Sequence, residues 1–562
     1  MFSSRILLIL SVLFLMLLMP GAASGRKVLS VTQFGAVPND GLDDGPALRK
    51  AAEWCRTHSG VELTWPAGVY DLRDSLAERI EREAISGAMG RGIEVQRKLF
   101  TEKGSPFYAV GLDFQGAKHL HIKAQGAVLR AWGWMEALSF RKAKDVTLEG
   151  LTLTTHRPAA TEARVMEVGT DGYVTLQFDP ERYTYVDESV QGRYYFYSER
   201  RGTFYYSGLK EPRLIAPGQI RSRVSGAQPE VGDVCVIRYG GHYRPCIMLK
   251  ESIRVRLQDV TIMNHSGMGV VGHMSENILI DGLRVVPEPG CVSSTTTDAT
   301  HFTSCSGEIT IRNSVFRGNG DDCTNIHNYY YQAIGVGGHP KQVELSVVGA
   351  DLHAQSLDVP QPGDTLWAVD AQSLAEQERY VVKSVTADEA AWRVRVTLDR
   401  PLRLLQGALM VNHSRFPHVR IENNTVVYHN GRAFLLKAPH VVVRGNKIMG
   451  STLTAIKLGA ELSWREAGPV ESAWVENNYI MNCGSAGGKD SPTAVMVTTE
   501  ARGDVPRVNR NIVIRNNFID CGDRPAFLIN DAQHVRIEGN IARGSGGGLR
   551  QHNTKDVTTD IK

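Results

Sequence analysis

The second half of the chain repeats a short pattern of apolar, polar and apolar residues that ends in an asparagine and then resumes with apolar residues. The repeated asparagines are Asn424, Asn446, Asn478, Asn517 and Asn540. Their steps of 22 residues (424 to 446) and 23 residues (517 to 540) each match one bare coil of a parallel β-helix, whereas steps of 32 and 39 indicate loops that extend from a coil. We expect the asparagines to mark a bend between strands and to stack as a hydrogen-bonded ladder.

Similar β-rich runs recur from Leu120 onward, and no helical period of comparable length competes with them. Ahead of these runs, the segment 31–41 ends in turn formers, a helix with an apolar face follows, and 60–70 reads as a strand pair. The helix is expected to cover the first coil, whose unpaired edges would otherwise recruit other chains. The opening, with Phe34-Gly-Ala and Trp65-Pro-Ala-Gly, resembles that of pectin-lyase-like enzymes. This resemblance implies an all-β fold, a right-handed parallel β-helix with an N-terminal capping helix.

Two stretches interrupt the repeat, from about 156 to 245 and from about 333 to 412. Both alternate with period two and contain a Gly-Asp turn leading into a strand, so each is predicted to be a small inserted antiparallel β-barrel. The second insert could wall a cleft, although either could also be decoration away from a site. The predicted layout is 1–24 signal peptide, 25–155 first β-helix part, 156–245 barrel, 246–332 catalytic coils, 333–412 barrel and 413–562 last coils.

The first 24 residues predict an exported protein. A basic start at Arg5 precedes an apolar run from Ile6 to Met19 and small residues up to Ser24, as in a secretory signal peptide. The alternative is an uncleaved membrane anchor. After cleavage we expect a periplasmic or extracellular protein without membrane contact. The net charge of +3, with no basic cluster interleaved with aromatics, argues against nucleic acid as a partner.

Eight cysteines lack the C-x-x-C spacing of zinc sites, so neither a metal nor a cofactor is expected. Export permits disulfides, and Cys235 with Cys246 could close a hairpin. The other interpretation is that the cysteines are small buried residues of the stack.

Three acidic residues carry the chemistry. Asp321 and Asp322 follow Asp298 by 23 and 24 residues, about one coil, so the acids should lie on neighbouring coils. Adjacent parallel strands are about 4.8 Å apart. Carboxyl groups this close cannot all ionise freely, which lets one stay protonated as an acid while another acts as a base. Cleavage of a sugar bond needs that division.

The segments 297–302 and 318–327, which contain these acids, resemble the signature of glycoside hydrolase family 110, bacterial exo-acting α-1,3-galactosidases. The likeness covers most of the mature chain. It implies removal of terminal α-1,3-linked galactose from an oligosaccharide or glycan, with inversion, by the aspartates that map onto Asp298, Asp321 and Asp322. The resemblance also allows a homodimer.

The assignment of acid and base within the trio stays open at this stage. Acids stacked directly would be about 5 Å apart, as in retaining enzymes, whereas inversion needs about 6.5–9.5 Å, so a sideways offset is required. Four further residues could bind sugar hydroxyls or could be structural: His301, Asn325, His327 and, more weakly, His273.

Two other functions fit the same fold. A polygalacturonase-like hydrolase or a calcium-dependent lyase would need an array of cations for uronate carboxylates, of which this region offers Arg312 and Arg317. A non-catalytic glycan-binding solenoid is the third candidate, because the fold alone supports it equally.

Overall fold

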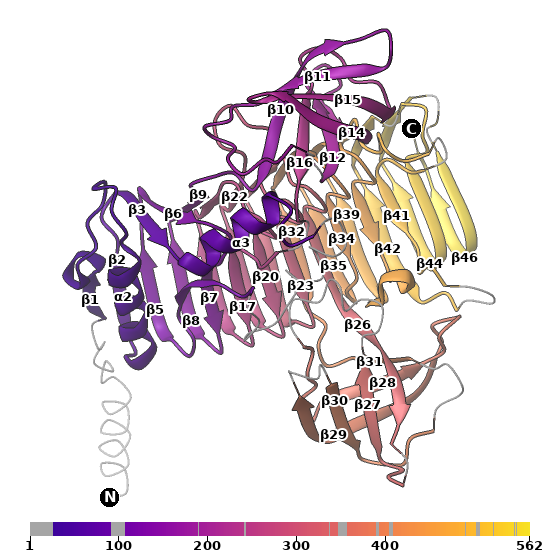
Figure 1. The fold of residues 1–562 in the computed structure, drawn as a ribbon. Helices are drawn as coiled ribbons and strands as arrows, with labels where there is room; N and C mark the ends of the chain where they lie inside the picture. The colour runs from indigo at the N-terminus through magenta and orange to yellow at the C-terminus, as the bar shows by residue number, and fades with distance from the viewer. Residues whose placement is uncertain are drawn as a thin grey trace, which may run out of the picture.

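The computed structural model describes residues 26–90, 107–188, 190, 192–240, 243–336, 338–346, 357–388, 393–403, 409–488, 491–501, 506–520, 522–544, 546 and 548–561. These residues wind into a parallel β-helix that carries two side domains (Figure 1). The predicted all-β class is confirmed. The predicted signal peptide, 1–24, lies outside the described residues.

The β-helix has three walls, each a column of parallel strands from successive coils. The first wall contains β1 (Lys27–Ser30), β2 (Val61–Thr64), β5 (Lys118–Lys123), β8 (Lys144–Glu149), β18 (Ile253–Gln258), β21 (Glu276–Asp281), β24 (Ser306–Arg312), β32 (His418–Glu422), β35 (His440–Arg444), β39 (Ser472–Glu476), β42 (Asn509–Arg515), β44 (Phe527–Glu538) and β46 (Leu549–Thr559).

The second wall contains β4 (Val110–Asp113), β7 (Glu136–Arg141), β17 (Ile247–Lys250), β20 (Val270–His273), β23 (Thr300–Thr303), β26 (Thr324–Gly335), β34 (Phe434–Leu436), β37 (Ile456–Leu458) and β41 (Val495–Val497), and it is completed by the start of β44 and β46. The third wall contains β3 (Gly68–Arg73), β6 (Ala127–Trp132), β9 (Thr152–Thr155), β19 (Thr261–Ile262), β22 (Arg284–Val285), β25 (Val315–Arg317), β33 (Thr425–His429), β36 (Lys447–Ser451), β40 (Tyr479–Met481), β43 (Phe518–Asp520) and β45 (Ile541–Arg543).

Residues at one register position stack along the axis and build the core. On the first wall Val255 pairs with Ile278, which pairs with Ile309 on the next coil, and all three are buried. Such columns give every coil an apolar interior without requiring a larger globular core.

The predicted asparagine ladder is confirmed. The Oδ1 atom of Asn446 accepts hydrogen bonds from the backbone N–H of Asn424 and from its amide Nδ2, and the same pair of bonds links each later asparagine of the series to the next. The Nδ2 of Asn446 also donates to the Ile421 carbonyl. Ser314 extends the ladder by one coil, because its N–H donates to Asn424. Each buried amide is thereby satisfied.

The N-terminal end carries the predicted helix α2 (Gly45–Thr57), whose buried side includes Leu48, Ala52 and Cys55. It lies against the first coil (Figure 1). A second helix, α3 (Ser75–Ile85), was not predicted. The Asp74 side chain caps it by accepting from the N–H groups of Leu76 and Ala77.

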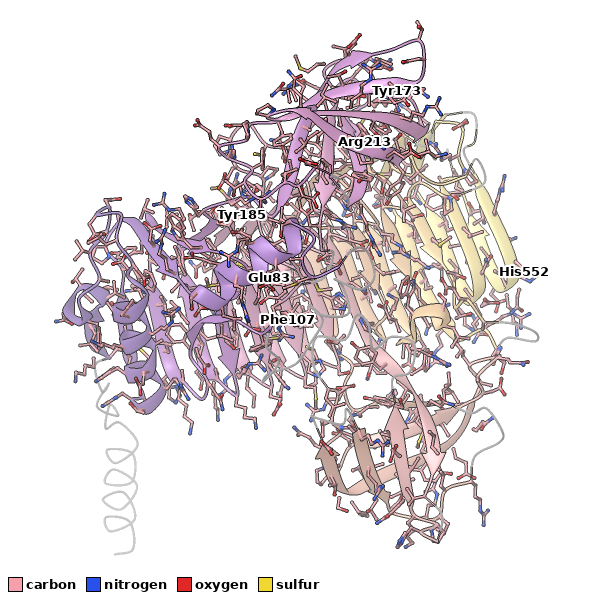
Figure 2. All side chains as sticks on the ribbon, in the orientation of Figure 1. Glu83, Phe107, Tyr173, Tyr185, Arg213 and His552 are labelled. Atoms are coloured by element: carbon pink, nitrogen blue, oxygen red, sulfur yellow. The ribbon has the colours of Figure 1, made fainter. Side chains whose placement is uncertain are left out.

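The two inserts project from opposite sides of the β-helix (Figure 1). The first is a seven-stranded antiparallel sheet in the order β13-β12-β16-β10-β11-β15-β14. Its strands are β10 (Ala160–Val168), β11 (Tyr173–Gln177), β12 (Arg193–Ser198), β13 (Thr203–Tyr205), β14 (Ser207–Ala216), β15 (Gln219–Gly226) and β16 (Val234–Arg238). Tyr173 and Arg213 lie on the part of this insert that projects away from the coils (Figure 2).

The second insert is the predicted antiparallel barrel, because its pairings close a ring in the order β26-β27-β30-β29-β28-β31-β26. Strand β26 begins on the second wall and continues into this barrel, so it crosses the predicted boundary at 332. The other strands are β27 (Gln342–Ser346), β28 (Thr365–Val369), β29 (Glu376–Asp388), β30 (Arg393–Leu398) and β31 (Leu409–Asn412).

The seven described cysteines are buried free thiols, which confirms their prediction as small residues of the interior; Cys521 lies outside the described residues. Cys235 and Cys246 therefore do not form the hairpin disulfide. Among the described residues, no helix has the length and apolar character needed to cross a membrane.

Candidate active site

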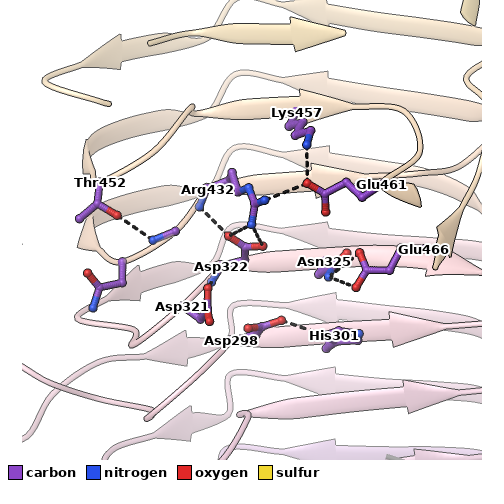
Figure 3. A network of polar contacts seen from close by, with 12 residues as sticks. Asp298, His301, Asp321, Asp322, Asn325, Arg432, Thr452, Lys457, Glu461 and Glu466 are labelled. Carbon is purple, nitrogen blue, oxygen red and sulfur yellow. Dashed lines mark hydrogen bonds and ion pairs between the residues drawn. The ribbon is translucent and has the colours of Figure 1, made fainter. Parts of the chain in front are cut away.

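The three aspartates lie where the chain enters the second wall. Strands β23, β26 and β34 pair in register, and Asp298, Asp322 and Arg432 each stand two residues before their strand. The Ala299 N–H donates to the Asp322 carbonyl, and the Cys323 N–H donates to the Arg432 carbonyl. Asp298, Asp322 and Arg432 thus follow one another on successive coils, with Asp321 one residue out of this line (Figure 3).

The loops that carry the acids are held by the first insert. Arg238 of β16 donates through Nη1 to the carbonyl of Thr296 and, at 3.0 Å, to that of Gly320. A Cβ at Gly320 would lie 2.2 Å from the Thr296 oxygen, so only glycine allows this approach. Packing therefore requires the glycine that precedes Asp321 and Asp322, independently of the chemistry of the two acids.

Asp298, Asp321 and Asp322 line one open pocket of about 610 Å³, together with the predicted His301 and Asn325. The pocket is lined further by Met268, Arg432, Leu435, Glu461, Trp464 and Glu466. All these residues belong to the β-helix coils. The expectation that the second insert walls the cleft is therefore wrong for the described residues. The physical reason is that β26 carries the barrel away from the pocket, while the segment after β37 folds back and pairs β38 (Glu466–Ala467) with β26.

Burial sets the protonation of the acids. It raises the pKa of Asp298 well above its ordinary value, and the neighbouring carboxyl groups of Asp321 and Glu466 raise it further. Burial also raises the pKa of Asp322 to about 8; Arg432 opposes this rise, whereas Asp321 and Asp298 add to it. The raised pKa values of Asp298 and Asp322 favour their protonated forms.

A network of charges behind the acids escaped the sequence analysis. Arg432 contacts Asp322 at 3.1 Å and Glu461 at 2.8 Å. Lys437 contacts Glu466 at 2.5 Å. Lys457 pairs with Glu461 (Figure 3). Burial opposes ionisation of Glu461, but Lys437, Arg432 and Lys457 lower its pKa.

The repeat contained a signal for part of this network. Asp322 lies eight residues after Ser314, and Arg432 lies eight residues after Asn424, the ladder partner of Ser314. The long step from Asn446 to Asn478 likewise marked the loop that holds Glu461 and Glu466.

The histidines form a buried chain. His301 Nδ1 lies 2.8 Å from Asp298 Oδ2, and His301 Nε2 lies 2.9 Å from His327 Nε2. His327 Nδ1 lies 2.8 Å from the Asn328 carbonyl oxygen. Burial lowers the pKa of His301 to about 4 and that of His327 to about 3. His327 lies behind His301 and is not part of the pocket lining.

His273 lies two coils before His327. It occupies the same register position as Thr303 on the intervening coil and as His327. It is fully buried and contacts Thr303 and the Leu357 carbonyl, so the structure does not bring it to the pocket. Asn325 lines the pocket, where its Oδ1 accepts from Lys437 at 3.1 Å.

One group has the spacing of a metal site: potential ligand atoms of His301, His327 and Glu466 lie within 4.8 Å of one another. Each already has a protein partner. The two Nε2 atoms share a hydrogen bond, and the Glu466 carboxylate is bonded to Lys437. A cation placed there would face that ammonium group, so the donor set fits a metal poorly.

No protein-family model matches the chain. It resembles curated proteins named alpha-1,3-galactosidase over most of its length. It is 26% identical to alpha-1,3-galactosidase A of Shewanella woodyi, covering 88% of this chain and 82% of that protein. The identity is 25% with alpha-1,3-galactosidase A of Bacteroides fragilis (92% and 87% covered) and 24% with alpha-1,3-galactosidase B of Akkermansia muciniphila (92% and 67% covered).

Among solved structures, the A-module of mannuronan C-5 epimerase AlgE4 from Azotobacter vinelandii aligns with a TM-score of 0.41 and 10% identity, covering 94% of this chain and all of that one. A match at this level says nothing about the reaction. The relationship to the alpha-1,3-galactosidases that the acidic motifs indicated is confirmed by the sequence relatives.

Proposed function

We propose that this homologue of the alpha-1,3-galactosidases is a glycoside hydrolase, an α-galactosidase that releases terminal α-1,3-linked galactose from glycans. The observation that carries the proposal is the convergence of Asp298, Asp321 and Asp322 on one pocket. The names of the relatives supply the bond and the sugar.

Asp298 is the general acid of the proposed mechanism. Its raised pKa favours the protonated carboxyl, whose O–H proton can pass to the glycosidic oxygen as the bond from that oxygen to C1 breaks. The bonding electrons leave with the oxygen. A water molecule then attacks C1 from the opposite face and gives its proton to the base.

Asp321 is the proposed base. Asp322 follows Asp298 in register on the next coil, and Asp321 lies one residue before Asp322. In an inverting enzyme the acid and the base must leave room for a water molecule next to the base. Asp321 is also the more exposed member of the doublet, and water can reach it. Asp322, held by the backbone and side chain of Arg432, supports the charge balance.

A neutral sugar fits the pocket better than a uronate. The cations beside it, Arg432, Lys437 and Lys457, are each paired with glutamates of the protein. Trp464 is 46% exposed where it lines the pocket and offers a ring on which a sugar face can stack. The loop carrying Glu461 and Glu466 bounds the pocket, which favours action on a terminal residue rather than within a chain.

The test is incubation of the full chain with the disaccharide Gal-α-1,3-Gal while the first-formed galactose is followed by anomeric NMR. We expect β-galactose first. Asp321→Asn should lose about 10²–10⁴-fold in rate, and added azide should restore turnover as the β-galactosyl azide. Asp281→Asn, in the surface pair with Arg312, is the matched control and should keep full rate. Release of α-galactose first, or full rate in Asp321→Asn, would overturn the mechanism.

Localisation follows from the N-terminal segment alone, and we propose that the mature enzyme acts after export. A fusion of residues 1–30 to a reporter should be secreted and cleaved near Ser24.

A further inference from the structure

The buried chain Asp298–His301–His327–Asn328 has a direction that the carbonyl at its end determines. A carbonyl oxygen only accepts, so the 2.8 Å contact with the Asn328 oxygen requires a proton on His327 Nδ1. The 2.9 Å contact between the two Nε2 atoms then requires one proton between them. The 2.8 Å contact between His301 Nδ1 and Asp298 Oδ2 requires another.

Three contacts thus hold three protons, which is one more than an ionised aspartate and two neutral histidines possess. The extra proton can reside on Asp298, on His301 or on His327. The second and third arrangements create an imidazolium and a carboxylate away from solvent, since Asp298, His301 and His327 are 5%, 7% and 2% exposed. The first arrangement creates no charge.

The charges around Asp298 favour the same arrangement, whereas those around the imidazoles act in both directions and burial disfavours an imidazolium. Asp321, Asp322 and Glu466 face Asp298 and disfavour a further negative charge, with Arg432 and Lys437 opposing them. Around the imidazoles, Lys437 disfavours a positive charge and Glu466 favours one; His327 Nε2 is 3.5 Å from the Glu466 carboxylate, which is itself bonded to Lys437. His273, one further buried imidazole, faces His327 from the second wall.

The end of the chain is firmly held. The Asn328 side chain donates to the carbonyls of Asn412 and Arg415 and accepts from Ser304 and from the Tyr329 N–H. Through Asn412, the last residue of β31, the second insert thereby helps to hold Asn328, whose carbonyl sets the direction. This gives the barrel a role at the site although it does not line the pocket.

We propose that His327 is a positioning residue that, through His301, keeps a proton on the Asp298 carboxyl until a glycosidic oxygen competes for it. The proposal rests on the proposed function in that it takes Asp298 as the acid. His301 is in the tautomer with hydrogen on Nε2, and His327 is in the tautomer with hydrogen on Nδ1.

The test replaces His327 by phenylalanine, which fills the space but removes the acceptor for His301 Nε2–H. His301 can then turn to the tautomer that donates to an ionised Asp298. We expect the alkaline limb of the pH profile of kcat/KM for Gal-α-1,3-Gal to move to lower pH by at least about one unit. A shift of one unit means that the acid binds its proton about tenfold more weakly. The rate at neutral pH should fall at least about tenfold.

A substrate that needs no acid separates positioning from general damage. With 2,4-dinitrophenyl α-galactoside the leaving group departs unaided, so His327→Phe should change kcat/KM by less than about twofold. His273→Phe, at the matching register position two coils earlier, is the packing control and should leave the alkaline limb in place. Equal losses on both substrates, or an unmoved limb in His327→Phe, would overturn the proposal.

A second measurement needs neither activity nor a folded variant at position 327. Difference infrared spectroscopy of the full-length wild type at pH 7 against Asp298→Asn should show a protonated-carboxyl band that only the wild type has. Absence of the band overturns the proposal even if galactose is released. Presence of the band without hydrolysis of any galactoside supports the protonated chain and instead refutes the proposed function.

Discussion

Two corners of the β-helix stack side chains in opposite ways. At the corner between the first and third walls, Asn424, Asn446 and the later asparagines stack as neutral amides that donate to and accept from one another. At the corner that leads into the second wall, Asp298 and Asp322 stack as acids that repel. A solenoid repeats the residues that its sequence places in register. The first corner therefore stabilises the coil, whereas at the second corner burial and repulsion between acids favour bound protons.

The largest effect is expected at the acid corner. Asp298→Asn keeps a hydrogen-bonding side chain but cannot donate a proton to the leaving oxygen, so the rate on Gal-α-1,3-Gal should fall about 10²–10⁴-fold. Its melting temperature at neutral pH should stay close to that of the wild type, because the raised pKa of Asp298 already favours an uncharged carboxyl and the amide keeps a hydrogen-bonding group. A clear loss of thermal stability would show that the acid corner is held together by Asp298 rather than strained by it.

Next in size is the cation that balances this corner. Arg432→Met removes the partner of Asp322 and Glu461 while keeping an apolar stem. Removing one member of a buried ion pair costs about 3–5 kcal/mol, to be measured by urea unfolding. Arg312→Met at the exposed pair with Asp281 is the control and should cost about 1 kcal/mol or less. Similar costs at both sites would contradict a buried network.

At the ladder corner, Asn446→Ala leaves the N–H of Asn424 and the Ile421 carbonyl without a side-chain partner. Each unsatisfied buried group costs about 1–3 kcal/mol in the free energy of unfolding. The kcat of the variant should match the wild type, because the ladder lies apart from the pocket lining. If activity falls in proportion to stability, the two corners are not independent.

The most gradual effect is the dependence of stability on pH. Burial raises the pKa of Asp298 and Asp322 above the unfolded value near 4, so the folded state binds protons that the unfolded state has lost. Their contribution is complete below about pH 4 and declines as pH rises through the folded values, by at most about 1.4 kcal/mol per pH unit for each group. Asp298→Asn should therefore flatten the wild-type curve above about pH 4. If the curves of stability against pH for Asp298→Asn and the wild type are parallel, the pKa of Asp298 is not raised.

The ladder and the acids were predictable for the same reason. Both depend on residues one coil apart, and the period of the repeat is visible in the bare sequence. The second insert was predictable as a barrel because apolar and polar residues alternate along its sequence with a period of two. The first insert is an antiparallel sheet rather than a demonstrated closed barrel, because the period of two sets the strands but not how the sheet ends meet.

The sequence by itself determined the coil, its register and the convergence of Asp298 with the Asp321–Asp322 doublet, because in a solenoid distance along the chain converts directly into distance in space. Only the tertiary structure decided what surrounds these acids. Arg238 comes from an insert, Arg432 follows another insert, and Glu466 returns on a loop. Nothing local links these residues to the acids, so their contacts, and the direction of the Asp298–His301–His327 chain, exist only once the coils and inserts have packed.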